Sequence, residues 1–535
     1  MKIMAKVMRR DTVMVKAKCD VVILGALVLL LGGCTTVGPD FIKPKAQEPD
    51  EWVEKDPRIK GEPADLSEWW KAFNDPVLDE LVETAYQQNL TLQMAGMRIF
   101  EARAQLGIAA GNLYPQVQSL SGSFTHTNLS ENSPNALSML DFKYNDLGAN
   151  FGAAWEIDLW GKFRRGVEAS NAAFEGTVAT YDDVLVSLTA NVAGAYTLIR
   201  TFEARLDVAR RNVNLQEQTL RIAEAQFEGG LVTELDVLQA RNLLYATRAS
   251  IPPLEAGRRQ SQNALATLLG VLPDKVQELL GDPKPIPSAP VDVAIGVPAD
   301  LLRRRPDIRL AERQVAAQCA LIGVAKADIY PHFSLFGSIG LRTSDTESLL
   351  PGGPSGIDVG DLFNSGSIQW FAGPSFTWDI LNYGRIKNKV RIEDARFQQT
   401  ELNYQNSVLR AVREVEDGLA GFIQASDAKI FFRESVSAAK RSVRISLVQY
   451  REGLVDYQRV LDAQRALASS QDAFVSTSGA VATNLVAVYR ALGGGWESRV
   501  GKDFIPEALK EEMAQRTDWG KILDPQASEV ESNLK

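Results

Sequence analysis

The longest feature of the hydropathy pattern is a pair of segments whose apolar residues recur as in an amphipathic helix. Residues 161–228 and 384–452 contain no proline, and apolar positions such as Val412, Val415 and Leu419 are spaced by threes and fours. At about 1.5 Å per residue, each segment predicts a helix roughly 100 Å long. An apolar helix face of that length is not stable when it is exposed to water, so we expect these helices to pack side by side in a coiled-coil wall.

A Gly-Leu-Val triplet interrupts the helical pattern at the end of each long segment. The first lies in FEGGLVTELDVLQAR and the second, 223 positions later, in YREGLVDYQRVLDAQ. The triplet residues are Gly230, Leu231, Val232, Gly453, Leu454 and Val455. Periodicity alone presents them as two similar interruptions at the same place in two similar helices.

Other landmarks repeat in the same order, which indicates an internal duplication. NLYPQV at Asn112 matches DIYPHF at Asp328, and WEIDLWGK at Trp155 matches TWDILNYGR at Thr377. Between the two halves, residues 281–305 contain five prolines and predict an irregular linker.

After each Tyr-Pro pair the apolar residues alternate with small or polar ones, as in strands with one apolar face. Phe151, Ala153 and Trp155 show this alternation in the first half, and Leu335 and Ile339 show it in the second. Residues 112–158 and 331–381 therefore each predict a hairpin of two long strands, four strands in all.

The predicted strands are longer than the roughly ten residues that a tilted strand needs to cross a bilayer. A four-stranded sheet cannot close in lipid, since its edges would leave backbone groups unpaired at a cost of several kcal/mol each. Closure therefore requires further chains. Three copies would supply twelve strands, which lies within the range of outer-membrane barrels, whereas two copies would form only the narrowest, filled kind.

The N-terminus has the layout of a signal peptide. Basic residues, among them Arg9, Arg10, Lys16 and Lys18, precede the apolar run VVILGALVLL, which is too short to span a bilayer comfortably. The run ends in LGGC, which resembles the bacterial lipobox and implies that residues 1–33 are removed and Cys34 is acylated. Thr35 stands where Asp would signal inner-membrane retention, so the resemblance implies anchoring in the lipid of the outer membrane. A plain secretory signal is the alternative.

Composition excludes several classes of function. The net charge is −9, and the predicted signal peptide holds six Lys or Arg but only two Asp or Glu, so the mature chain is more acidic still. This charge argues against nucleic-acid binding. The chain has two histidines, His126 and His332, at or beside strand positions, and we expect no base, nucleophile or metal ligand near either. Cys319 is alone in a helical stretch, so no disulfide framework, metal site, cofactor or catalytic constellation is predicted.

Two conspicuous motifs are predicted to be structural. Asp75 and Pro76 form a helix cap and first turn, followed by the apolar stripe Leu78, Leu81, Val82 and Ala85. The run from Arg303 to Arg305 suggests an anion site, but Pro306 and Asp307 after it are typical of ordinary helix initiation.

Several separated motifs together resemble the TolC-like outer membrane factors, in particular the lipoprotein branch that serves resistance-nodulation-division (RND) efflux pumps. They are CTTVGPDFIKP, WWKAFNDPVLDELVETAYQQN, LLRRRPDIRLAERQV and ALGGGW, and the resemblance covers residues 34–496. It implies an α+β membrane channel: a homotrimer with a 12-stranded outer-membrane β-barrel, four strands per chain, and a long periplasmic α-helical coiled-coil barrel. The implied partners are a periplasmic adaptor (membrane fusion) protein and an inner-membrane RND-type transporter.

The resemblance also assigns roles to single residues. The two Gly-Leu-Val triplets become turns at the periplasmic tips of helix pairs, with Gly230 and Gly453 allowing the reversal and the adaptor contacting both triplets. Asp462 matches an acidic residue that rings the closed entrance, and Tyr450 with Asp236 matches a hydrogen-bonded link that holds it shut. The alternative interpretation of Asp462 is an ordinary solvent-exposed helix residue. For nearby Asp456 the alternative is a plain helix N-cap.

Arg459 departs from family members that carry a second acidic ring at its position, which puts strong cation selectivity at the entrance in doubt.

The predicted order of segments follows from these assignments. They are a signal peptide (1–33), a lipidated segment with the first helices (34–111), a β-hairpin (112–158), a long helical hairpin (159–280), the linker (281–305), a helix (306–330), a second β-hairpin (331–381), a second long helical hairpin (382–492) and a tail (493–535), of which 497–535 lies outside the resemblance.

The function that this predicts is a passive duct of a tripartite efflux pump, not an enzyme. A channel for type I protein secretion and a structural periplasmic lipoprotein are the alternatives, and the paired amphipathic strands count against the latter.

Overall fold

The computed structural model describes most of the chain as two compact units. The described residues are 36–47, 49–62, 65–130, 143–290, 293–296, 298–300, 304–345 and 359–523. The first unit comprises Met1–Lys43, Ala104–Ala173 and Gln314–Thr400, and the second comprises Pro44–Arg103, Phe174–Arg313 and Glu401–Lys535. The predicted signal peptide, Cys34 and Arg303 lie outside the described residues.

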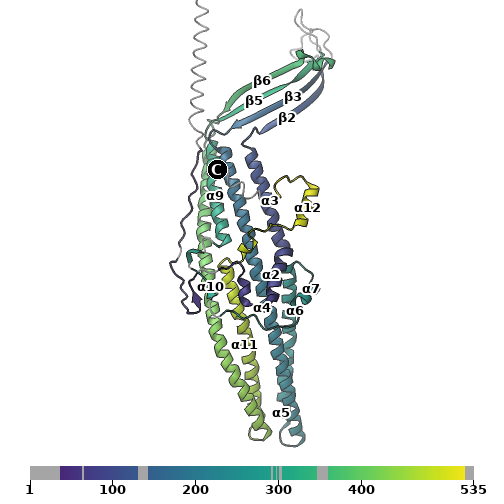
Figure 1. Cartoon of the computed structure of the whole chain (residues 1–535), viewed down its shortest axis with the longest axis vertical. Helices are drawn as coiled ribbons and strands as arrows, with labels where there is room; N and C mark the ends of the chain where they lie inside the picture. Colours follow the sequence, from purple (N-terminus) through teal and green to yellow (C-terminus); the bar gives the residue numbers. More distant parts are fainter. Residues whose placement is uncertain are drawn as a thin grey trace, which may run out of the picture. The chain divides into compact units, whose positions relative to one another are not determined.

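Four long strands in the first unit form one antiparallel sheet (Figure 1). They are β2 (Val117–Asn128), β3 (Lys143–Ile157), β5 (His332–Ser344) and β6 (Ile368–Thr377), and their order in the sheet is β2-β3-β5-β6. Among the described residues, the outer strands β2 and β6 each pair with one neighbour in this sheet. A single chain therefore presents two sheet edges.

The register of the sheet aligns large apolar side chains across all four strands. Leu120 pairs with Phe151, Phe151 with Ile339, and Ile339 with Trp370, so the four side chains form one row on one face. All four are exposed. The alternation predicted from the sequence thus produces a continuous apolar face rather than four separate ones.

A second, small sheet was not predicted. It pairs β1 (Ile59–Lys60) in parallel with β4 (Val293–Ala294). Of the two strands, β4 lies in the segment that its prolines predicted to be an irregular linker. Two-residue strands are too short for a period to be recognised in the sequence.

Two helices of 67 residues each dominate the helical part: α4 (Lys162–Glu228) and α10 (Arg385–Arg451). Their bounds agree closely with the proline-free segments. In the second unit the buried positions of α10 follow the expected spacing of threes and fours: Tyr404, Val408, Ala411, Val415, Leu419 and Phe422. No helix within the described ranges is both long and apolar enough to cross a membrane.

The helices that return from α4 and α10 differ. α11 (Tyr457–Ala491) is one helix of 35 residues, whereas the first return is divided into α5 (Glu234–Ala249) and α6 (Ile251–Leu269). The division falls at Ser250, just before Pro252 and Pro253, which lack the N–H groups that would continue the helical hydrogen bonds. A short helix, α7 (Pro273–Leu280), follows.

The first helices of the second unit are built as their motifs predict. A 3₁₀ turn (Trp69–Phe73) precedes α2 (Pro76–Gln88), and the Asp75 carboxylate caps α2 by accepting from Val77 N at 3.1 Å. The predicted apolar stripe of α2 is buried. Trp69 stacks on Tyr489 of α11 with ring centroids 5.1 Å apart.

Buried ion pairs join residues far apart in the second unit. Asp182 of α4 has a fully buried side chain that pairs with Arg309 of α9 (Pro306–Ala327) and with Arg499 near the C-terminus. Arg305 is also buried, and its guanidinium bonds to Asp307, to Glu414 and to the backbone oxygen of Ala491. The Arg305 guanidinium therefore bonds to groups of the protein itself, which agrees with a structural role for this residue rather than an anion site.

The described part of the tail docks on α3 (Leu90–Gly111), an arrangement that the sequence did not predict. Ile505 and Met513, the latter on α12 (Glu507–Arg516), pack with Phe100 in a buried apolar cluster. Gly96 permits the approach, because a Cβ there would lie 2.5 Å from the backbone oxygen of Phe504.

We expect Asp182→Ala to lower the free energy of unfolding by about 3–5 kcal/mol, because it leaves two guanidinium groups without their buried carboxylate. Denaturant titration of the detergent-solubilised protein measures this. The control is Asp207→Ala, which removes an exposed carboxylate of the same helix, 61% accessible and paired with Arg211, and should cost less than about 1 kcal/mol. Equal losses in both variants would contradict the assignment.

Candidate functional site

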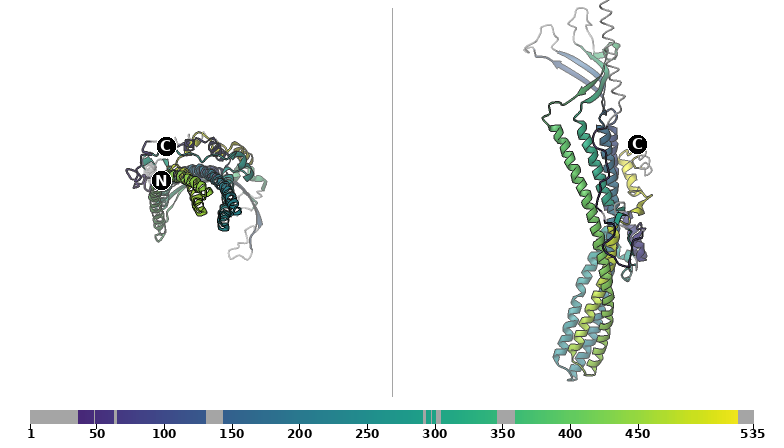
Figure 2. Two further views of the ribbon diagram at one scale, coloured as in Figure 1. Left: turned by 90° about the horizontal axis from the view of Figure 1, so that it is seen from below. Right: turned by 90° about the vertical axis from the view of Figure 1, so that its left-hand side faces the viewer.

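The two Gly-Leu-Val triplets lie in turns that connect helices of the second unit. The first tip (residues 229–233) joins α4 to α5, and the second tip (residues 452–456) joins α10 to α11. Both turns lie at the same end of their helix pairs, and the pairs run side by side there (Figures 1 and 2). The interruptions seen in the sequence are therefore chain reversals.

Both reversals use the same backbone hydrogen bonds. Gly230 has φ +70° and Gly453 has φ +72°, in the left-handed region that favours glycine. Leu231 N donates to Gln226 O, and Leu454 N donates to Gln449 O, each at 2.9 Å. These bonds define a Schellman C-cap in each tip, which explains why the same residues recur in both halves.

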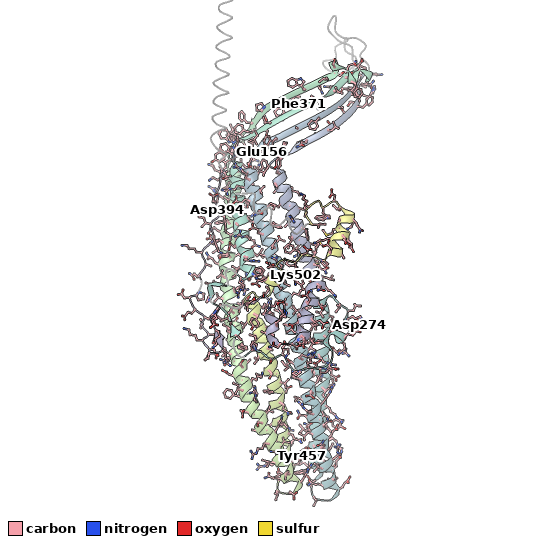
Figure 3. All side chains as sticks on the ribbon, viewed as in Figure 1. Glu156, Asp274, Phe371, Asp394, Tyr457 and Lys502 are labelled. Atoms are coloured by element: carbon pink, nitrogen blue, oxygen red, sulfur yellow. The ribbon has the colours of Figure 1, made fainter. Side chains whose placement is uncertain are left out.

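A hydrophobic cluster holds the four helices together behind the tips. Its buried members come from α4, α5, α10 and α11: Ala223, Val237, Ala240, Leu243, Tyr450, Tyr457, Val460 and Leu461. The rings of Tyr450 and Tyr457 meet edge to face with centroids 5.4 Å apart, and Figure 3 labels Tyr457 near the tips. Val232 and Val455 pack against this cluster and are only partly exposed.

The two residues of the predicted link between the helix pairs lie close together. The Tyr450 hydroxyl of α10 lies 3.4 Å from Asp236 Oδ2 of α5, which is long for an O–H···O bond. Burial and the neighbouring Asp236 carboxylate raise the pKa of Tyr450 well above its usual range, so this hydroxyl stays protonated and can donate.

A second polar contact, not predicted from the sequence, crosses between the same two pairs. Gln226 Nε2 of α4 donates to the backbone oxygen of Tyr450 at 3.3 Å, next to the C-terminus of α10. The signal that could have revealed Gln226 is its repeat: Gln449 stands at the matching position of the second half.

The Tyr450–Asp236 pair has no equivalent elsewhere in the duplication. The position that matches Tyr450 is Phe227, and the position that matches Asp236 is Arg459. A phenyl ring and a guanidinium cannot reproduce the hydroxyl–carboxylate bond. The link therefore forms once per chain, between α10 of the second half and α5 of the first.

The remaining predicted gate residues lie on the exposed surface of α11. Asp462 is exposed and its Oδ1 accepts from Gln458 Nε2 at 3.0 Å. Arg459, three residues before it, is exposed on the neighbouring turn. Asp456 lies at the N-cap of α11 and accepts from Arg459 N at 3.4 Å, as a plain cap would.

Between the tips there is a hollow of about 620 Å³ whose lining includes Asp236, Tyr450 and Asp456. Beside it the tips expose apolar side chains: Leu231 is 76% and Leu454 is 74% accessible. Among the six predicted adaptor-contact residues, these two leucines offer large apolar side chains to a partner, whereas the two valines are turned towards the cluster.

Titratable side chains away from the tips bear on metal binding and on acid–base pairing. Within the described residues, no group of three or more His, Cys, Asp or Glu side chains is placed to hold a metal ion. The expectation that His332 has no base nearby is wrong, because β5 pairs with β3 and brings Glu156 Oε1 to 2.8 Å from His332 Nδ1. Burial raises the pKa of the Cys319 thiol, which disfavours the reactive thiolate.

Comparison with known proteins identifies the family. The model of the family described as outer membrane efflux protein matches residues 81–271 and 297–494, more than half of the chain. Nodulation protein T of Rhizobium leguminosarum bv. trifolii is 30% identical over 88% of this chain and 96% of its own length. The solvent efflux pump outer membrane protein SrpC of Pseudomonas putida is 32% identical over 88% of this chain and 97% of its own.

Structural comparison agrees. The solved structure of the outer-membrane channel OprN matches with a TM-score of 0.78 at 30% identity, over 86% of this chain and 99% of the channel. The family consists of efflux channels of the outer membrane and not of enzymes. The chain therefore belongs to the outer membrane efflux protein family.

Proposed function

We propose that the chain is one of three identical subunits of an outer-membrane duct, in which three four-stranded sheets close a 12-stranded barrel. The observation that carries this proposal is the sheet itself, which combines a row of exposed apolar side chains with two edges that one chain leaves open. In lipid those edges need partners, and copies of the same sheet can supply them.

The duct serves a tripartite efflux pump for small molecules, together with a periplasmic adaptor and an inner-membrane RND-type transporter. SrpC, which is similar over nearly its whole length, is described as part of a solvent efflux pump. This relationship favours efflux over type I protein secretion, which would use the same architecture. The duct is passive, and the transporter supplies the energy.

The second unit supplies a gate at the periplasmic end of the duct. The contact between Tyr450 and Asp236, at 3.4 Å, and the apolar cluster behind it hold the two helix pairs of a subunit together. In the trimer, three copies of Asp462 face the axis, and their mutual repulsion favours a bound cation. Arg459 beside each copy weakens the selectivity that a fully acidic entrance would have.

The adaptor docks on the two tips, chiefly on Leu231 and Leu454. Exposed leucines at a helix turn provide an apolar anchor that is buried on binding. Acylation of Cys34 anchors each subunit in the lipid of the outer membrane.

Two variants test the gate: the double variant Tyr450→Phe/Asp236→Asn and the single variant Asp462→Ala. Each should raise single-channel conductance in a planar bilayer. A hydrogen bond contributes about 0.5–1.5 kcal/mol, so its loss should shift the closed-to-open ratio by roughly two- to twelvefold per subunit. Tyr245→Phe, which removes an exposed hydroxyl from α5, is the control. Conductance unchanged in both gate variants would remove the gate assignment.

Adaptor docking is tested by cysteine cross-linking in cells. Leu231→Cys and Leu454→Cys should capture the adaptor more efficiently than Val232→Cys and Val455→Cys, because the leucine side chains are the more accessible. Buried Cys319 gives little background. Leu272→Cys, 72% accessible in the turn between α6 and α7, is the matched negative control. No capture from either tip in an actively exporting cell would count against the duct itself.

A further inference from the structure

The face of the four-stranded sheet that lies opposite the apolar row differs from it in composition. Successive side chains of a strand point to opposite faces, so the residues next to Leu120, Phe151, Ile339 and Trp370 belong to this second face. Its three middle rows, taken from β2 to β6, are Val117, Ala154, Phe336 and Gly373, then Ser119, Gly152, Ser338 and Phe371, then Ser121, Asn150, Gly340 and Gln369. These residues, which we call the polar face, are mostly small or polar.

Two aromatic side chains depart from this composition. Phe336 on β5 and Phe371 on β6 form a pair on the polar face, with ring centroids 6.0 Å apart and 59° between the ring planes. Figure 3 labels Phe371 on the sheet. Phe336 is 42% and Phe371 is 56% accessible, so the pair is exposed rather than packed into a core.

The neighbours of the two rings are too small to cover them. Phe336 pairs with Ala154 on β3 and with Gly373 on β6, and Phe371 pairs with Ser338 on β5. Hydrogen, methyl and hydroxymethyl side chains do not reach across a phenyl ring. Within one chain, aromatic surface therefore remains open for contact with another molecule.

The surroundings of the aromatic pair are uncharged. No residue of the polar face carries a charge, and the charged residues that follow at either end of it are paired. Glu156 Oε1 lies 2.8 Å from His332 Nδ1 at one end, and Arg342 Nη2 lies 2.8 Å from Asp146 Oδ2 at the other. An ionic molecule would find no unpaired counter-charge beside the rings, so the site suits a neutral one.

The place of the pair in the proposed duct limits what can reach it. The apolar face is the one that would contact lipid, so the polar face would line the water-filled interior. Two phenyl rings in that lining expose apolar surface to water, which is unfavourable until a solute covers it. The molecules that pass along this surface are water and the exported compounds.

We propose that Phe336 and Phe371 form a contact site for neutral solutes that carry an aromatic ring. The ring of the solute lies against the open phenyl surface, in the offset or edge-to-face arrangement that aromatic groups prefer. Ser338, which pairs with Phe371 and lies two residues from Phe336, offers a hydroxyl to a polar group of the same solute. Such a contact is weak enough to release the solute again, as passage requires. The proposal rests on the proposed duct and adds the class of solute that its wall retains.

Saturation-transfer NMR on detergent-solubilised trimers tests the site. The probe is N-acetyltryptophanamide, which is neutral, soluble and aromatic, and the comparison compound is N-acetylleucinamide, which has the same polar part without a ring. Wild-type trimers should transfer saturation to the indole protons. The double variant Phe336→Leu/Phe371→Leu keeps apolar side chains but removes both rings, and should weaken binding of the aromatic probe about two- to twelvefold. Binding of N-acetylleucinamide should change little.

A second aromatic pair of the same two strands provides the matched control. Phe333 and Phe376 lie on the apolar face with ring centroids 6.2 Å apart, where detergent covers them in the solubilised protein. Phe333→Leu/Phe376→Leu should therefore leave binding of the aromatic probe unchanged. Phe371→Tyr, which retains the ring, should retain binding, which separates loss of the ring from a disturbance of the fold.

Absence of saturation transfer from wild-type trimers to the indole would overturn the proposal, as expected if another segment or copy of the chain covers the rings. Equal losses in the two double variants would also overturn it, because they would indicate that aromatic pairs act only by stabilising the β5–β6 pairing. Conductance of the same trimers keeps the two proposals apart. Trimers that conduct without binding the probe remove the site and leave the duct, whereas trimers that bind it through this pair without conducting remove the duct and leave the site.

Discussion

Backbone groups placed in hydrocarbon must be bonded to one another, because no water is present to replace a missing partner. In the proposed barrel this constraint acts on β2 and β6, each of which pairs with one neighbour among the described strands. The exposed apolar row from Leu120 to Trp370 suits an apolar surrounding, and in the proposed barrel the two outer strands would pair with strands of other copies. In the proposed trimer, copies of the same sheet would supply the missing partners.

The two halves of the duplicated chain carry the same elements, but they are not equivalent. Each half supplies two strands, one helix of 67 residues and one glycine-capped tip. They differ at the contact between the helix pairs and in the return helix. Tyr450 and Asp236 have Phe227 and Arg459 as their counterparts, and the return helix is divided at Ser250 in the first half only. The repeat gives both halves the same elements, and departures from the repeat distinguish one contact between helices from the next.

Much of the fold could be predicted because its signals are local. Strand alternation, the length of α4 and α10, and the caps at Asp75 and Asp456 all depend on residues within a few positions of one another. The tips were harder. Their glycines are visible in the sequence, but periodicity alone does not distinguish a break from a reversal, and the family resemblance was needed for that step. The orientation of Val232 and Val455 towards the cluster depends on four helices at once.

The sequence by itself determined the alternating strands, the paired long helices, the repeated tips and the absence of a recognisable catalytic motif, since each depends on residue type and spacing. The tertiary structure decided which distant residues meet. Asp182 finds Arg309 and Arg499, His332 finds Glu156, and the tail covers α3, in each case across a separation that no period encodes. Residues 36–40 show the same limit: Gly38, Gly161 and Gly323 are ordinary glycines in the sequence, and only packing reveals that Gly38 lies against Gly323 and Thr36 against Gly161.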